Sequence, residues 1–396
     1  MFKIRKVSLL LSLGLIALNT HAQWIPLNSG TSFSLYSIQF INDSVGFVTG
    51  NGTSSEGIIL KTQNQGQSWD TSFFSSTAEL GQVFFTDLDT GYAGFGNDII
   101  KTVDGGIQWT GLNDTFVNVS KGLFFVNGRT GYYAVSGAVY KTNDGGSSWS
   151  MHPAQTSNTD GIYFFNEDTG IIGGWYNPLL SKTIDGGNNW SVITSQYSIM
   201  SLHFPSSNIG YAVGGNIILK TTNAGDSWIP QVSGLDSSQW LFSIYCTDTN
   251  NCYAVGAQGI ILKTIDGGNT WIQQNSGTTQ TLNSIYCTLN NCYAVGGNGV
   301  ILKTIDGEVG IHKSTIEKKS EIIIAPNPSN AIFNLETGLF NPGQLYIYNS
   351  VGETVFERTI YLPETKINLS SQPDGIYFLR IKSGDKYFFE KLVITR

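Results

Sequence analysis

Apolar and polar residues alternate along short stretches over most of the chain. Residues 37–40, 201–204 and 243–246 alternate in this way, and a polar turn separates each of them from a second apolar stretch such as 210–214. A third stretch, as at 217–220, follows a Gly-Asn turn. Period-two alternation bounded by Gly, Asn and Asp predicts strands joined by tight turns. We therefore expect an all-β protein built from short antiparallel strands.

A nine-residue motif, which we call the box, follows each group of three such stretches. It reads Lys-Thr-x-Asp/Asn-x-Gly-x-x-Trp, and the seventh copy stops before its Trp. The threonines of the copies stand at positions 62, 102, 142, 183, 221, 264 and 304. A period of about 40 residues is that of a four-stranded propeller blade. Seven copies predict a seven-bladed β-propeller.

The box resembles the Asp-box of bacterial neuraminidase repeats. Its Thr and its Asp or Asn can bond the turn backbone, its Gly can take a positive φ, and its Trp can cover the hairpin. One acidic residue per turn, replaced by Asn in two copies, makes a poor metal cage, so we expect no metal and no cofactor. We assign a structural role to one residue of each box: Asn64, Asp104, Asp144, Asp185, Asn223, Asp266 and Asp306.

The missing Trp of the seventh box predicts how the ring closes. Residues 23–31 resemble residues 270–278, which end the sixth box and follow it. The N-terminal segment therefore supplies the outer strand that the last blade lacks, which leaves no unpaired edge between the first and last blades. This N-terminal strand closure assigns residues 23–307 to the propeller.

Four cysteines stand at equivalent places in the last two blades. Cys246 and Cys287 align with a Phe of other blades, and Cys252 and Cys292 align with a Gly. Opposed residues on paired strands are close enough for a disulfide bond, and an exported protein meets an oxidising compartment. We expect two local disulfide bonds, 246 to 252 and 287 to 292. A zinc site would require pairs from neighbouring blades to converge.

The first 22 residues have the pattern of a signal peptide. Three basic residues precede the apolar run 7–18, which is too short to span a bilayer, and Thr20-His21-Ala22 provides small residues at the cleavage site. A buried N-terminal helix is the alternative. No other apolar run approaches 18 residues, so we expect no membrane span.

A second domain is expected after a polar linker at residues 308–320. Seven short strands between 322 and 394 predict a small antiparallel, Ig-like β-sandwich. The motifs at 326–330, 345–352, 367–379 and 391–394 resemble, in order, the type A C-terminal sorting domain of the type IX secretion system of Bacteroidetes. Ala331 stands where that family usually has Gly. The alternative is an ordinary Ig-like adhesion module.

This resemblance implies a partner and a destination. The type IX secretion machinery would read residues 321–396 at the outer membrane and usually remove them. The product would then be secreted or held at the cell surface after passing through the periplasm.

Charge excludes two classes of partner. The net charge is −7, and residues 24–306 carry 9 Lys and Arg against 19 Asp and Glu. A mildly acidic body has no electrostatic footprint for nucleic acid or anionic lipid. We expect a monomer that binds neither.

The propeller resembles the photosystem II assembly factor family, and more loosely sialidases. Sialidases grip a carboxylate with three Arg, and the photosystem role implies an Arg-rich face, but Arg129 is the only Arg between 24 and 306. The propeller holds two His, His152 and His203, and no nucleophile or metalloprotease motif. We expect that the protein is not an enzyme. The alternative is a glycoside hydrolase or sialidase-like enzyme that uses a carboxylate pair across the channel.

Recognition is the function that remains. Loops that enter the innermost strands and loops between second and third strands share one rim of a propeller. Trp175, Tyr176 and Trp240 fall in such loops, where other blades have smaller residues. Large aromatics can stack on a sugar or anchor a protein, or they can simply pack on adjacent blades. We predict a non-catalytic recognition or scaffold module with an unidentified protein or glycan ligand.

Overall fold

The computed structural model describes residues 24–112, 116, 122–154, 157–177, 180–194, 196–304, 322–337, 343–349, 353–360, 364–383 and 386–396. The expected signal peptide and linker lie outside these residues, as does Asp306, so the domain boundaries remain predictions.

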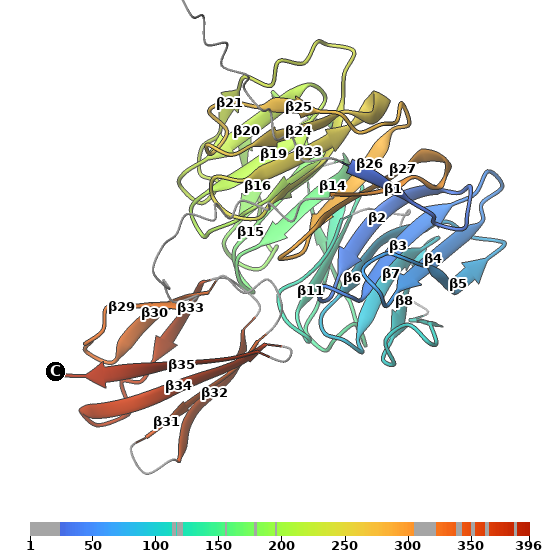
Figure 1. The fold of residues 1–396 in the computed structure, drawn as a ribbon. Helices are drawn as coiled ribbons and strands as arrows, with labels where there is room; N and C mark the ends of the chain where they lie inside the picture. The colour runs from blue at the N-terminus through green and yellow to red at the C-terminus, as the bar shows by residue number, and fades with distance from the viewer. Residues whose placement is uncertain are drawn as a thin grey trace, which may run out of the picture.

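Seven four-stranded antiparallel sheets form the propeller, as the box count predicted (Figure 1). Blades 1 to 3 contain β2 (Ser34–Phe40), β3 (Gly46–Asn51), β4 (Gly57–Thr62) and β5 (Asp70–Ser75); β6 (Leu80–Phe85), β7 (Gly91–Phe95), β8 (Asp98–Thr102) and β9 (Thr110–Gly111); and β10 (Gly122–Phe125), β11 (Gly131–Val135), β12 (Ala138–Thr142) and β13 (Ser150–Pro153).

Blades 4 to 6 repeat this order. They contain β14 (Ser157–Phe164), β15 (Gly170–Asn177), β16 (Leu180–Thr183) and β17 (Ser191–Thr194); β18 (Ser201–His203), β19 (Gly210–Gly214), β20 (Ile217–Thr221) and β21 (Ile229–Gln231); and β22 (Leu241–Cys246), β23 (Cys252–Gly256), β24 (Ile261–Thr264) and β25 (Ile272–Gln274). The first strands of successive blades contact one another around the whole ring, so these are the innermost strands.

Blade 7 is completed from the N-terminus. It consists of β26 (Leu282–Cys287), β27 (Cys292–Gly296), β28 (Ile301–Thr304) and β1 (Trp24–Leu27). Strand β1 pairs with β28 in antiparallel register from Trp24 opposite Thr304 to Leu27 opposite Ile301. Trp24 is buried and meets the Tyr253 ring edge to face, with centroids 5.9 Å apart. The closure predicted from the missing seventh Trp is confirmed.

The segment after β1 forms the same hydrogen bonds as the segment after β25. The Ser29 hydroxyl donates to the Thr31 carbonyl at 3.1 Å, and Ser276 donates to Thr278 at the same distance. Each segment packs against a one-turn 3₁₀ helix, Gly297–Gly299 and Ala257–Gly259 respectively. The sequence similarity between 23–31 and 270–278 therefore reflects the same loop used twice.

In most blades one Phe packs both within its own blade and against the preceding blade. In blades 1 to 5 a Phe near the end of the innermost stretch covers a Gly at the start of the second strand; a Cβ on Gly46 would lie 2.8 Å from the Phe40 ring. The same Phe often stacks on an aromatic of the preceding blade. These stacks are Phe40 on Tyr293 (4.1 Å), Phe85 on Phe47 (4.0 Å), Phe125 on Tyr92 (4.1 Å) and Phe164 on Tyr132 (3.5 Å).

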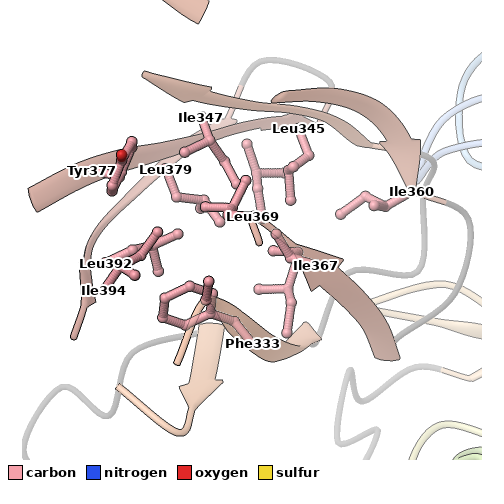
Figure 2. Packing of buried hydrophobic residues seen from close by; sticks show 13 residues of the cluster. Phe333, Leu345, Ile347, Ile360, Ile367, Leu369, Tyr377, Leu379, Leu392 and Ile394 are labelled. Atoms are coloured by element: carbon pink, nitrogen blue, oxygen red, sulfur yellow. The ribbon is translucent and has the colours of Figure 1, made fainter. Parts of the chain in front are cut away.

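The C-terminal region is a two-sheet sandwich, as predicted. One sheet has the order β29 (Ile322–Ala325), β30 (Ile332–Thr337), β33 (Glu364–Asn368), and the other has the order β32 (Thr354–Ile360), β31 (Gly343–Tyr348), β34 (Gly375–Ser383), β35 (Lys386–Ile394). Figure 2 shows Phe333 and Ile367 of the first sheet facing Leu345, Leu379 and Leu392 of the second. Within the described residues, no helix has the length and hydropathy needed to cross a membrane.

Candidate ligand-binding rim

The propeller has two rims. The box rim consists of the boxes and the turns that join first and second strands; the two are tied together, for example by the Gly105 N–H, which donates to the Asp89 carbonyl at 2.8 Å. The loop rim consists of the loops between second and third strands and the loops that enter the innermost strands. The Gly96 N–H donates to the Glu79 carbonyl there, at 2.9 Å.

The box aspartates are used inside their own turns. The Thr142 hydroxyl donates to Asp144 Oδ1 at 2.8 Å and accepts the Gly146 N–H at 2.9 Å, and the Ser148 hydroxyl and N–H donate to the same carboxylate. The Ser148 bonds lower the pKa of Asp144 to about 2. The described boxes repeat this arrangement at Asn64, Asp104, Asp185, Asn223 and Asp266.

Six box lysines form a hydrogen bond to the following blade, which the sequence did not reveal. Lys61 Nζ donates to the Gly105 carbonyl of the following box at 2.7 Å, and Lys303 of blade 7 donates to Gln65 of blade 1 at 3.3 Å. Six of the seven ammonium groups, all except that of Lys182, also lie 5.2 to 5.6 Å from the centroid of an aromatic ring on their own second strand. The box lysines therefore help to hold adjacent blades of the ring together.

The cysteines of blades 6 and 7 replace the Phe and Gly of other blades. Cys246 lies opposite Cys252, and Cys287 lies opposite Cys292. Each pair forms a disulfide bond in the structure. No metal-binding group of three or more His, Cys, Asp or Glu occurs among the described residues.

Trp175 and Trp240 meet on the loop rim. Trp175 lies near the end of β15 in blade 4, Trp240 immediately precedes β22 in blade 6, and their rings pack edge to face with centroids 6.2 Å apart. Both are partly exposed. The Trp175 carbonyl accepts the Ser198 hydroxyl at 2.9 Å, and the Trp240 carbonyl accepts the Ala257 N–H at 2.8 Å. The pair thus connects blades 4 and 6, and the Ser198 bond attaches it to the segment that enters blade 5.

Tyr176, the third predicted rim residue, follows Trp175 in β15, and its side chain lies outside the described part of the structure. The two tryptophans come from positions 65 residues apart in sequence, so their contact could be found only once the blades were assembled.

A belt of mostly aromatic residues runs from blade to blade along the innermost strands. One residue per blade, next to the Phe or Cys that ends the inner stretch, contributes to it: Gln39, Phe84, Phe124, Tyr163, His203, Tyr245 and Tyr286. Several successive rings are in contact, with centroids 4.3 Å apart for His203 and Tyr245 and 4.8 Å for Tyr245 and Tyr286. Burial raises the pKa of Tyr286 to about 12.

His203 serves this belt as a hydrogen-bond acceptor. Its Nδ1 accepts the Cys246 N–H of the next blade at 3.3 Å, just as Gln39 Oε1 accepts the Phe85 N–H at 2.6 Å. Burial lowers the pKa of His203 to about 4. The ring is neutral at ordinary pH and holds neighbouring blades together.

The C-terminal motifs connect the first loop of the sandwich to its last strand. Asn327 Nδ2 donates to the Lys391 carbonyl at 2.6 Å, and Asn327 Oδ1 accepts the Val393 N–H at 2.9 Å. The Ser329 N–H donates to the Val393 carbonyl at 3.0 Å. Ala331 has a φ of 80°, in the left-handed region that favours Gly, which explains why the resembling family usually has Gly there.

Comparison with known families finds a match at residues 323–395, to the Secretion system C-terminal sorting domain. No curated protein matches the chain significantly. The family match confirms the sorting domain that the motifs predicted.

Solved structures resemble the propeller in fold. YCF48 bound to D1 peptide is 16% identical with a TM-score of 0.60, covering 71% of this chain and 96% of that one. YCF48 from Cyanidioschyzon merolae is 16% identical with a TM-score of 0.59, covering 72% and 98%. PorZ, a surface component of the type IX secretion system of Porphyromonas gingivalis, is 12% identical with a TM-score of 0.51; the match covers 91% of this chain and 59% of PorZ.

These identities establish the fold alone, whereas the sorting domain establishes export. The chain is a β-propeller protein that carries a C-terminal sorting domain and is delivered to the cell surface or the extracellular space.

Proposed function

We propose that the propeller is a non-catalytic recognition module and that its loop rim holds the ligand. The observation that carries this proposal is the pair formed by Trp175 and Trp240. Two large aromatic side chains from different blades meet at the rim and remain partly exposed. Aromatic anchors of this kind are enriched where proteins bind sugars or other proteins.

The distribution of the other polar residues supports the same assignment. Box aspartates, box lysines and His203 are all engaged in bonds within or between blades. Arg129 lies in a turn of the box rim, where its carbonyl accepts the Gly145 N–H. A similar propeller, YCF48, was solved with a bound peptide, so this fold can present a ligand surface.

The boundaries that we propose are a signal peptide at 1–22, the propeller at 23–307, a linker at 308–320 and the sorting domain at 321–396. The machinery of the type IX system is the proposed partner of the last segment, and the mature propeller is proposed to act as a monomer.

A binding screen of the purified mature protein tests the recognition proposal. We expect a hit on a glycan array or a surface-protein panel, and replacement of Trp175 or Trp240 by Ala should weaken binding by roughly 1 to 3 kcal/mol for each anchor without changing the melting curve. Ile184→Ala, at an exposed position on the box rim, is the control. Turnover of an aryl-glycoside or a sialoside, lost on replacing one carboxylate, would instead identify an enzyme.

A further inference from the structure

The charges of the propeller are segregated between its rims. All described Lys of the propeller lie in boxes, and Arg129 lies in a box-rim turn. Among the described residues, the loop rim carries five carboxylates and no Lys or Arg; Lys121 lies outside the described residues. The loop-rim carboxylates are Glu56, Glu79, Asp98, Asp160 and Asp236.

The box-rim cations do not neutralise the loop rim. The side-chain bonds of six box lysines end on a carbonyl or carboxylate of the following box or its adjoining turn, as for Lys101 on Gly145 and Lys220 on Gly267. These groups are fixed at the far end of the blades. Among the described residues, the charged groups on the loop rim are therefore carboxylates, and an acidic surface attracts cations.

Two of the carboxylates belong to residues that lie close to the tryptophans, one across the strand pairing and one along the chain. Asp160 occupies the irregular step of β14 between Thr159, which lies opposite Gly174, and Gly161, which lies opposite Gly173, so it is beside the residue that precedes Trp175. Asp236 begins the turn that leads to Trp240, and this turn is fixed by the Gln239 N–H donating to the Asp236 carbonyl at 3.2 Å.

Asp236 is an exposed, charged group. Its carboxylate accepts the N–H and the hydroxyl of Ser238 at 2.8 and 2.6 Å, and these bonds lower its pKa. Trp faces are the best partners for cations among side chains, and a nearby carboxylate adds to the attraction. Partly exposed tryptophans on a rim whose described charged residues are all acidic are complementary to a Lys or Arg side chain.

We propose that the loop rim binds a peptide segment that presents Lys or Arg, with the cationic group packed on the exposed surface of the Trp175–Trp240 pair and attracted by the carboxylates of this rim. The proposal rests on the recognition function above and names its ligand class. Such a segment would belong to an extracellular or surface-exposed protein, because the propeller is exported.

Fluorescence anisotropy with a short labelled peptide of alternating Lys and Ser tests this proposal, using the mature chain. Analogues with Gln or Glu in place of Lys provide the comparison. We expect binding of the Lys peptide that weakens with salt, little binding of the Gln peptide and none of the Glu peptide. Trp175→Ala and Trp240→Ala should each weaken binding roughly five- to thirtyfold.

Charge variants separate a site from general attraction to an acidic protein. Asp236→Asn should weaken binding severalfold, whereas Asp70→Asn, the same charge change at an exposed position beside a box, should leave it nearly unchanged. Equal effects of the two variants, or affinity unaffected by either Trp variant, would overturn the proposal. If a glycan binds and depends on both tryptophans while the Lys peptide does not bind, the recognition function stands and the cationic ligand is wrong.

Discussion

His203 illustrates how the propeller uses polar residues near its axis. It occupies the position that Gln39 occupies in blade 1, and both side chains accept a backbone N–H from the next blade. The role requires an acceptor and not a titrating group. An imidazole held in this way is a structural residue even though a His in a propeller channel invites a catalytic interpretation.

Stability should therefore fall as the pH is lowered through the range set by His203. Its pKa is about 4 in the folded protein and about 6.5 when unfolded, so the unfolded state binds the proton first. This contribution is fully present above pH 6.5 and is lost toward pH 4, by about 1 to 3 kcal/mol. Urea unfolding at several pH values measures it.

His203→Gln is the matched variant, because Gln39 shows that Gln can make the same bond. The variant should remain stable at neutral pH and lose the component between pH 6.5 and 4. An unchanged pH dependence would contradict the assignment. The box aspartates titrate in a lower window, since hydrogen bonds hold the pKa of Asp144 and Asp185 at about 2.

Residue-scale roles were predictable where the sequence repeats. The alignment of Cys246 with Phe and Cys252 with Gly identified two positions that face each other, because it compares equivalent places in different blades. The lysine bonds to the following box were not predictable, since they depend on how blades are placed side by side. The contact of Trp175 with Trp240 was not predictable for the same reason, since it joins residues of different blades.

At the scale of elements, β1 is the critical strand. It adds only four residues, yet it completes the sheet of blade 7 and buries Trp24 in the core between blades 6 and 7. The sequence predicted this pairing because two copies of one loop had diverged little. The strands of the sandwich were also predicted, from turn residues that bound each stretch.

Deletion of residues 23–31 from the mature protein should lower its melting temperature by several degrees or make it insoluble. Removing β1 exposes the edge of β28 and the apolar surface that Trp24 covers. Differential scanning calorimetry measures the change.

Point variants at Trp24 provide the control for this deletion. Trp24→Ala should cost roughly 3 to 5 kcal/mol, whereas Trp24→Phe, which keeps an aromatic ring against Tyr253, should cost much less. A deletion that leaves the melting temperature unchanged would mean that the strand does not close the ring.

On the scale of the whole molecule, export and the proposed recognition function belong to separate parts of the chain. The sandwich has its own core and the propeller has its own closed ring of contacts. Removal of one should therefore leave the fold of the other intact.

Truncation after Lys319 should leave the protein in the periplasm of a host with the type IX system, with the propeller still folded. Cell fractionation and protease accessibility of intact cells measure its location. The full-length chain with Trp175→Ala is the control and should reach the surface normally. Surface delivery of the truncated chain would refute the role of residues 321–396.

Closure by β1 also imposes an order on biosynthesis. With the proposed signal peptide at 1–22, Trp24 would be among the first propeller residues to leave the cytoplasm, and its partner Thr304 would be among the last. The ring could then not close while blade 7 was still being translocated, so the emerging chain would stay open until the final blade arrived. A topology that joins the two ends of the propeller would thus delay completion of the fold until after export.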